Sequence, residues 1–146
     1  MIEFVWIKYA HFIGVFMVVS SLFAELVLVK NEVSGERMQL LSKIDGVYGL
    51  GALIAVSAGL ALWFSYGKPA DFYTSNSLFL IKVSLFTIVG ILSIWPTIFF
   101  VKNRKAKGED SLKIPRGIRI SILIEVILLL VLPLLAVAMA NGIDLR

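Results

Sequence analysis

The sequence contains no cysteine and a single histidine, His11, among its 146 residues. Because thiols are absent, disulfides, thiolate metal sites, iron–sulfur clusters and thioether-linked haem are excluded. One histidine also excludes a bis-histidine haem within one protomer. Neither a phosphate-binding glycine loop nor a GxSxG nucleophile motif is present. Any chemistry therefore has to come from a small set of other polar side chains.

Charged residues are also scarce. They make up 16% of the chain, whereas a soluble domain usually carries about 25%. Hydrophobic residues make up 59% and the mean hydropathy is +0.92. A bilayer-spanning helix needs about 20 mostly apolar residues, and four runs are long enough, at about 4–29, 46–66, 78–101 and 118–140. The first run is too long for the apolar core of a cleaved signal, so it is expected to stay as a spanning helix.

The connections between these runs are too short to fold alone. The sequence therefore predicts one domain, residues 1–146, that is all-α: an integral membrane, antiparallel four-helix bundle with up-down-up-down topology.

The basic residues are concentrated in the first and third connections, which hold three and seven of the fourteen lysines and arginines. Cytoplasmic loops carry such an excess, so both termini are expected to lie outside a cytoplasmic membrane. The positive charge is then explained by membrane topology and by attraction to anionic lipid headgroups. The expected partner is therefore the lipid bilayer, and nucleic-acid binding is not expected. These ten residues are Lys30, Arg37, Lys43, Lys102, Arg104, Lys105, Lys107, Lys113, Arg116 and Arg119.

Small residues recur along the second apolar run at Gly51, Ala55 and Gly59. This spacing lets another helix backbone approach closely. The stripe is expected to serve packing inside the bundle, with self-association or contact with a membrane partner as the alternative.

Ionisable groups inside a membrane are costly, so each is a candidate functional residue. The predicted topology places two of them, His11 and Lys82, in the outer third of the bilayer. Four others fall toward the inner side and form a second cluster at a different depth: Glu25, Asp45, Tyr48 and Glu125.

Each candidate also has a structural explanation. His11 could simply be hydrogen-bonded, Lys82 could extend its long side chain to the outer surface, and Glu25 could reach inner headgroups or pair with a loop lysine. Glu125 is harder to explain in this way, because its short side chain does not reach water easily. It is expected to be protonated or to have a partner such as Tyr48, Lys43 or Arg119.

His11 could ligate a haem iron alone, with Lys82 or Met139 on the opposite side, and Lys82 matches its depth better. The inner cluster has three carboxylates and no histidine. This composition suits a proton or a hard cation better than zinc or copper.

Several of these residues belong to a pattern that covers nearly the whole chain. His11 and Glu25 are followed by residues 45–50 (DGVYGL), then by Lys82, and then by residues 93–97 (SIWPT). In this order the chain resembles the DUF2214 family of four-helix bacterial membrane proteins, whose function is unknown. That family is remotely similar to HemJ-type protoporphyrinogen oxidases and to CopD-like membrane proteins.

The HemJ group pairs a histidine in its first helix with a lysine in its third and carries b-type haem. The resemblance thus implies a haem-binding cytoplasmic-membrane protein for electron transfer or porphyrinogen oxidation. His11 would be the axial ligand, and Lys82 the second ligand or a propionate partner. The inner cluster would be a proton relay or a structural lock. The alternatives are an accessory subunit of a membrane complex and a small proton-coupled transporter.

Overall fold

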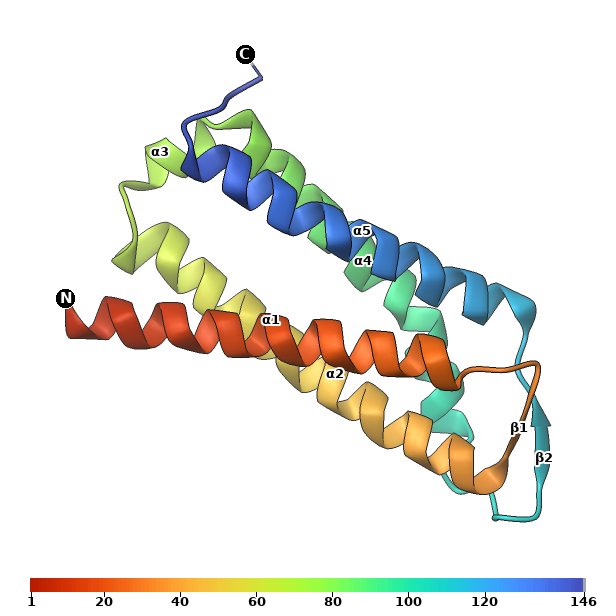
Figure 1. The fold of residues 1–146 in the computed structure, drawn as a ribbon. Helices are drawn as coiled ribbons and strands as arrows, with labels where there is room; N and C mark the ends of the chain where they lie inside the picture. The colour runs from red at the N-terminus through yellow and green to blue at the C-terminus, as the bar shows by residue number, and fades with distance from the viewer. Residues whose placement is uncertain (146) are drawn as a thin grey trace.

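The computed structural model describes residues 1–145 and consists almost entirely of helices (Figure 1). The long helices are α1 (Ile2–Leu28), α2 (Gly35–Ala61), α4 (Ser77–Lys102) and α5 (Arg116–Ala140). A π-helical turn, η1 (Leu62–Tyr66), extends α2, and a short helix, α3 (Ala70–Thr74), follows it. All four long helices have the length and apolar composition to cross a membrane. The predicted all-α bundle is confirmed.

Three of the four helices begin and end within two residues of the expected apolar runs. The exception is α2, which begins at Gly35 and not near residue 46. The Ser34 hydroxyl caps its first turn by accepting a hydrogen bond from the N–H of Arg37. Met38 and Leu41 on the added turns are fully buried. The apolar run marks the part of α2 suited to a bilayer interior, whereas capping and packing determine where the helix begins.

The helices form two hairpins, α1 with α2 and α4 with α5, that pack tightly within themselves and less extensively against each other. The hairpins diverge toward the end of the bundle where both termini lie (Figure 1). We call this the terminal end. The opposite end carries two short strands, β1 (Glu32–Ser34) and β2 (Ser111–Lys113), and we call it the ribbon end.

The ribbon end joins the first and third connections. β1 and β2 pair antiparallel, with Val33 opposite Leu112. The N–H of Gly35 donates to the carbonyl oxygen of Asp110 at 2.9 Å, and the side-chain amide of Gln39 donates to the Ala106 carbonyl. Both basic connections therefore lie at one end of the bundle, as their shared charge predicted.

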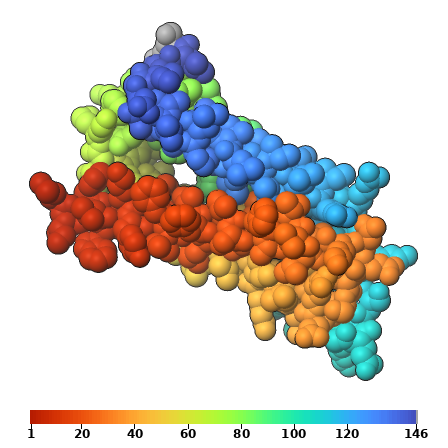
Figure 2. All heavy atoms as spheres, viewed as in Figure 1, coloured from red at the N-terminus to blue at the C-terminus, as the bar shows by residue number. Residues whose placement is uncertain are grey.

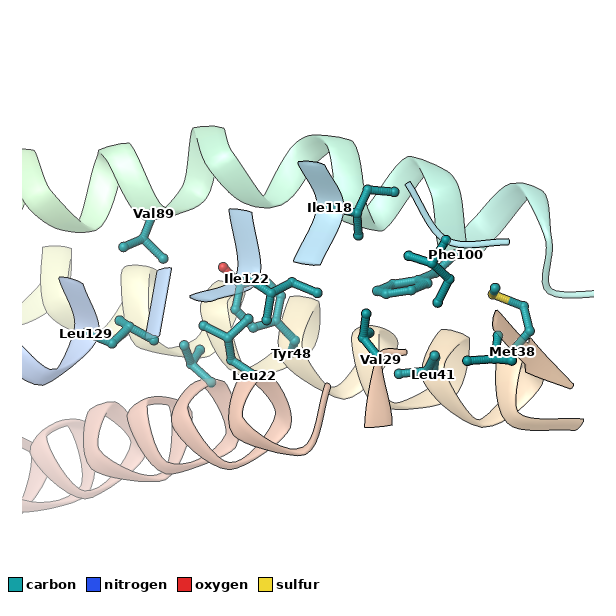
Figure 3. Close-up of a cluster of buried hydrophobic side chains, with 13 residues drawn as sticks. Leu22, Val29, Met38, Leu41, Tyr48, Val89, Phe100, Ile118, Ile122 and Leu129 are labelled. Carbon is teal, nitrogen blue, oxygen red and sulfur yellow. The ribbon is translucent and has the colours of Figure 1, made fainter. Parts of the chain in front are cut away.

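The hydrophobic core lies mostly in the half of the bundle near the ribbon end (Figure 3). Phe100 and Ile118 of the second hairpin meet Met38 and Leu41 of the first, and all four are fully buried. Tyr48 lies farther along the same cluster, beside Leu22 and Ile122. This packing joins the two hairpins and positions the polar groups described next.

α1 and α5 lie at the front in Figure 2, and many of their large apolar side chains are exposed. Phe12, Phe16 and Phe23 of α1 are more than half exposed, as are Leu130 and Leu134 of α5. A surface of this kind suits lipid, because acyl chains are as apolar as these side chains.

Candidate functional site: a carboxyl cluster between the hairpins

Three carboxyl groups from three helices meet in the half of the bundle near the ribbon end. Glu25 lies near the end of α1, Asp45 lies on α2 and Glu125 on α5, and their exposed fractions are 1%, 5% and 0%. Tyr48 is one helical turn beyond Asp45 and is 6% exposed. The structure thus brings together the four residues of the predicted inner cluster, which we call the carboxyl cluster.

The first branch of this cluster joins Glu25 to Asp45. Their side chains lie close enough to form a hydrogen bond with each other. Two carboxyl groups can bond in this way only when they share at least one proton, because a carboxylate is purely an acceptor. The Thr97 hydroxyl of α4 donates to Asp45 Oδ1 at 3.1 Å. The branch therefore runs from α1 through α2 to α4.

The second branch is centred on Tyr48. Tyr48 lies close to Ser93 of α4 and to Glu125 of α5 and can interact with both. The Ser93 hydroxyl itself donates to the Gly90 carbonyl of its own helix at 2.7 Å. The Ser121 hydroxyl, one turn before Glu125, lies 3.5 Å from Glu125 Oε1 and donates to the Leu92 carbonyl at 2.9 Å. Because a serine hydroxyl has one proton and the Leu92 carbonyl is nearer, Ser121 gives Glu125 little donor support.

Two carboxyl oxygens in the cluster, Glu25 Oε1 and Glu125 Oε2, are buried without a hydrogen-bond partner. In the described part of the chain, acids and hydroxyls are the groups that interact with the three carboxyls, and none is a lysine or an arginine. A buried carboxylate with neither a counter-charge nor full hydrogen bonding is very costly. The arrangement therefore favours carboxyl groups that hold protons.

Several expectations for these residues need correction. Lys43 and Arg119 were candidate partners of Glu125, but both are exposed, and its partners are Tyr48 and Ser121. Glu25 neither reaches headgroups nor pairs with a loop lysine, because it is buried against Asp45. Helix rotation decides both outcomes, since it points these side chains into the interface between hairpins.

Ser121 is the one member that the sequence interpretation missed. It lies four residues before Glu125 and hence on the same helix face. That spacing was an available signal. Ser93 and Thr97 belong to the 93–97 segment of the pattern, and both turn toward the cluster.

The outer pair lies separately, toward the terminal end. The Nδ1–H of His11 donates to the Ala55 carbonyl oxygen of α2 at 2.8 Å. Lys82 of α4 is close enough to interact electrostatically with the ring, and both side chains are half-buried. With Nδ1 engaged, Nε2 is the nitrogen available to a ligand.

This geometry fits the donor requirement of an axial haem ligand, because ligating histidines usually donate their other ring N–H to a carbonyl or carboxylate. Lys82 could pair with a propionate. No group of three or more His, Cys, Asp or Glu residues within 1–145 is arranged to hold a metal ion.

The small-residue stripe of α2 is covered by α1. A Cβ atom at Gly51 would lie 2.5 Å from Met17 Cβ, and one at Gly59 would lie 3.2 Å from His11 Cε1. Ala55 accepts the His11 hydrogen bond. The stripe thus packs inside the bundle, so it is not available to a partner in this structure.

A family model described as "Predicted membrane protein (DUF2214)" matches residues 4–144. The chain belongs to the DUF2214 family. Together with the four apolar helices, this membership makes it a multi-pass membrane protein, and the resemblance to the DUF2214 family is confirmed. No curated protein and no solved structure matches the chain.

Proposed function

We propose that this DUF2214 protein binds and releases protons at the carboxyl cluster, as the proton-carrying part of a small proton-coupled membrane transporter. The observation that carries the proposal is the meeting of Glu25, Asp45 and Glu125, from three helices, without a lysine or arginine among their partners in residues 1–145. Ionisable groups in such positions commonly mark proton pathways.

The two branches of the cluster give a proton more than one place to reside. Glu25 lies close enough to Asp45, and Glu125 to Tyr48, for a proton to be shared within each pair. The three carboxyls are also close enough to interact electrostatically. Loss of a proton from one group therefore changes the cost of losing one from another, which couples the branches.

The test uses protein reconstituted in liposomes and three charge-removing variants: Glu25→Gln, Asp45→Asn and Glu125→Gln. Infrared difference spectra between acidic and alkaline buffer should show a protonated-carboxyl band that each variant reduces. A dye trapped inside the vesicles should report proton uptake that Glu125→Gln abolishes.

The matched control is Glu109→Gln, which removes an exposed glutamate from the third connection. It should leave both signals unchanged. Wild-type infrared spectra without a protonated-carboxyl band, or proton uptake that survives all three cluster variants, would overturn the proposal.

A second candidate is supported by the His11–Ala55 hydrogen bond, which leaves Nε2 free for a b-type haem iron. A haem there would supply one-electron redox chemistry. His11 would then hold the iron, and Lys82 would be the second iron ligand or a partner of a propionate. The protein would act in electron transfer or porphyrinogen oxidation.

The visible spectrum of purified protein, oxidised and dithionite-reduced, tests this candidate. A Soret band that shifts on reduction, vanishes in His11→Ala and persists in Glu125→Gln would support haem at His11. A colourless protein from haem-supplied cells would reject it. If both candidates fail, the protein is better assigned as an accessory subunit.

A further inference from the structure

We infer that the ribbon end carries a binding site for one anionic phospholipid, in a hollow between the end of α1 and the first turns of α2. The hollow has a volume of about 510 Å³. It lies apart from the carboxyl cluster, and the inference does not depend on proton binding. Its lining residues are Leu28, Ser34, Glu36, Arg37, Gln39, Leu40 and Lys43.

The position of the hollow along the bundle points to a lipid. Leu28 is the last residue of the 27-residue apolar helix α1, so the hollow begins where the apolar part of the bundle ends. That level matches the boundary between acyl chains and headgroups. Leu28 and Leu40 form an apolar wall, and Leu40 is 47% exposed. A soluble anion would gain nothing from contact with this apolar wall, whereas the first methylenes of a lipid acyl chain would pack against it.

The charges of the hollow point to an anionic headgroup. Arg37 and Lys43 lie on two turns of α2, and Glu36 is the one acidic residue among the lining side chains. Arginine can hold two phosphate oxygens at once, and lysine adds a second cation. The Ser34 oxygen accepts from the Arg37 N–H, and its hydroxyl proton remains available to an oxygen of the headgroup.

The surroundings strengthen this complementarity. Ten of the fourteen basic residues lie in the two connections that meet at the ribbon end or on the adjoining turns of α2, α4 and α5. Basic segments next to a spanning helix attract anionic lipids with about 1 kcal/mol per residue, or about fivefold in affinity. This general attraction would gather anionic lipids, and the hollow would select one of them.

The experiment compares lipid retention and thermal unfolding of detergent-purified protein with added phosphatidylglycerol or phosphatidylcholine. Native mass spectrometry should show one phosphatidylglycerol retained, with a matching rise in Tm. Arg37→Gln/Lys43→Gln should weaken binding about thirtyfold, as expected for two basic contacts. The control Arg104→Gln/Lys105→Gln removes the same charge from exposed positions at the same end that do not line the hollow, so it should weaken binding much less than Arg37→Gln/Lys43→Gln.

Two further measurements separate the lipid from other sources of the effect. Leu40→Ser should reduce phosphatidylglycerol retention while leaving the net charge unchanged. Equal losses in the two double variants would mean diffuse attraction without a site. An equal rise in Tm with inorganic phosphate would mean a free-anion site. Either result, or no preference over phosphatidylcholine, would overturn the inference.

Discussion

Thr97 Oγ1 donates a hydrogen bond to Asp45 Oδ1 at 3.1 Å and thereby connects α4 to α2 across the interface between the hairpins. Thr97 lies one turn after Ser93, which lies close to Tyr48 of the same neighbouring helix. The contacts between the two hairpins are thus partly polar, and they lie where the carboxyl cluster is buried. Changes to the cluster should therefore affect how firmly the hairpins are held together.

Thr97→Val should destabilise the bundle by about 1–3 kcal/mol, because it leaves a buried acceptor on Asp45 without this donor while nearly conserving volume. Unfolding in a denaturing detergent series, followed by circular dichroism, would measure the change. Thr87→Val is the matched control, since its hydroxyl bonds only to the Val83 carbonyl of its own helix and is exposed. Equal effects of the two variants would show that the Asp45 contact contributes nothing.

Glu125→Lys should prevent stable folding, whereas Glu125→Gln should fold. A lysine there would place an unpaired cation in a fully buried position, at a cost of several kcal/mol. Glutamine has nearly the same shape and can still bond to Tyr48. Size-exclusion profiles of detergent extracts would distinguish the two outcomes. Glu109→Lys makes the same exchange at an exposed position and should remain monodisperse.

Gly14→Ala should weaken the α1–α2 hairpin by about 1–3 kcal/mol, since overpacking forces the backbones apart. The added Cβ would lie 2.5 Å from the Ala55 amide nitrogen and 2.8 Å from the Gly51 carbonyl oxygen. Gly49→Ala is the control, because its Cβ would meet no atom within 4 Å. Differential scanning fluorimetry should show a lower Tm for the first variant alone. A Tm for Gly14→Ala equal to that of the wild type would contradict the close approach of the two helices.

Gly35→Ala should loosen the ribbon end, because its Cβ would lie 1.6 Å from the Lys107 carbonyl oxygen, which is too close for any side chain. The third connection would have to move away, and the Gly35–Asp110 hydrogen bond would break. Hydrogen exchange by mass spectrometry should then show faster exchange in peptides around residues 32–35 and 107–113. Gly108→Ala, with open space around its Cβ, should exchange like the wild type. Unchanged exchange in Gly35→Ala would mean that the two connections do not meet as described.

The one-dimensional pattern was sufficient for the architecture. Apolar runs of spanning length identified four helices, and the basic residues correctly predicted that the first and third connections share one end. These features depend on the lengths of the apolar runs and on the positions of charged residues along the chain. Both are known from the sequence without any knowledge of tertiary contacts. Depth followed from the same reasoning, so His11 and Lys82 were separated from Glu25, Asp45 and Glu125 in advance.

Only the tertiary structure decided which polar side chains at the same level of the bundle contact one another. From the sequence, Tyr48, Lys43 and Arg119 were all possible partners of Glu125. In the structure, the Glu125 side chain points toward Tyr48, whereas Lys43 and Arg119 are exposed. The same holds for the pairing of Glu25 with Asp45.

The physical reason is that the interior of the bundle and the surrounding lipid are equally apolar. In a soluble bundle, apolar side chains mark the buried face, but lipid is as apolar as the protein interior, so periodicity hardly reports how a helix is rotated. The sequence by itself determined which helices can span a membrane and at what level along the bundle the polar residues lie. Close packing, such as that of Gly14 against Ala55, set the rotation of the helices and so decided which polar groups meet.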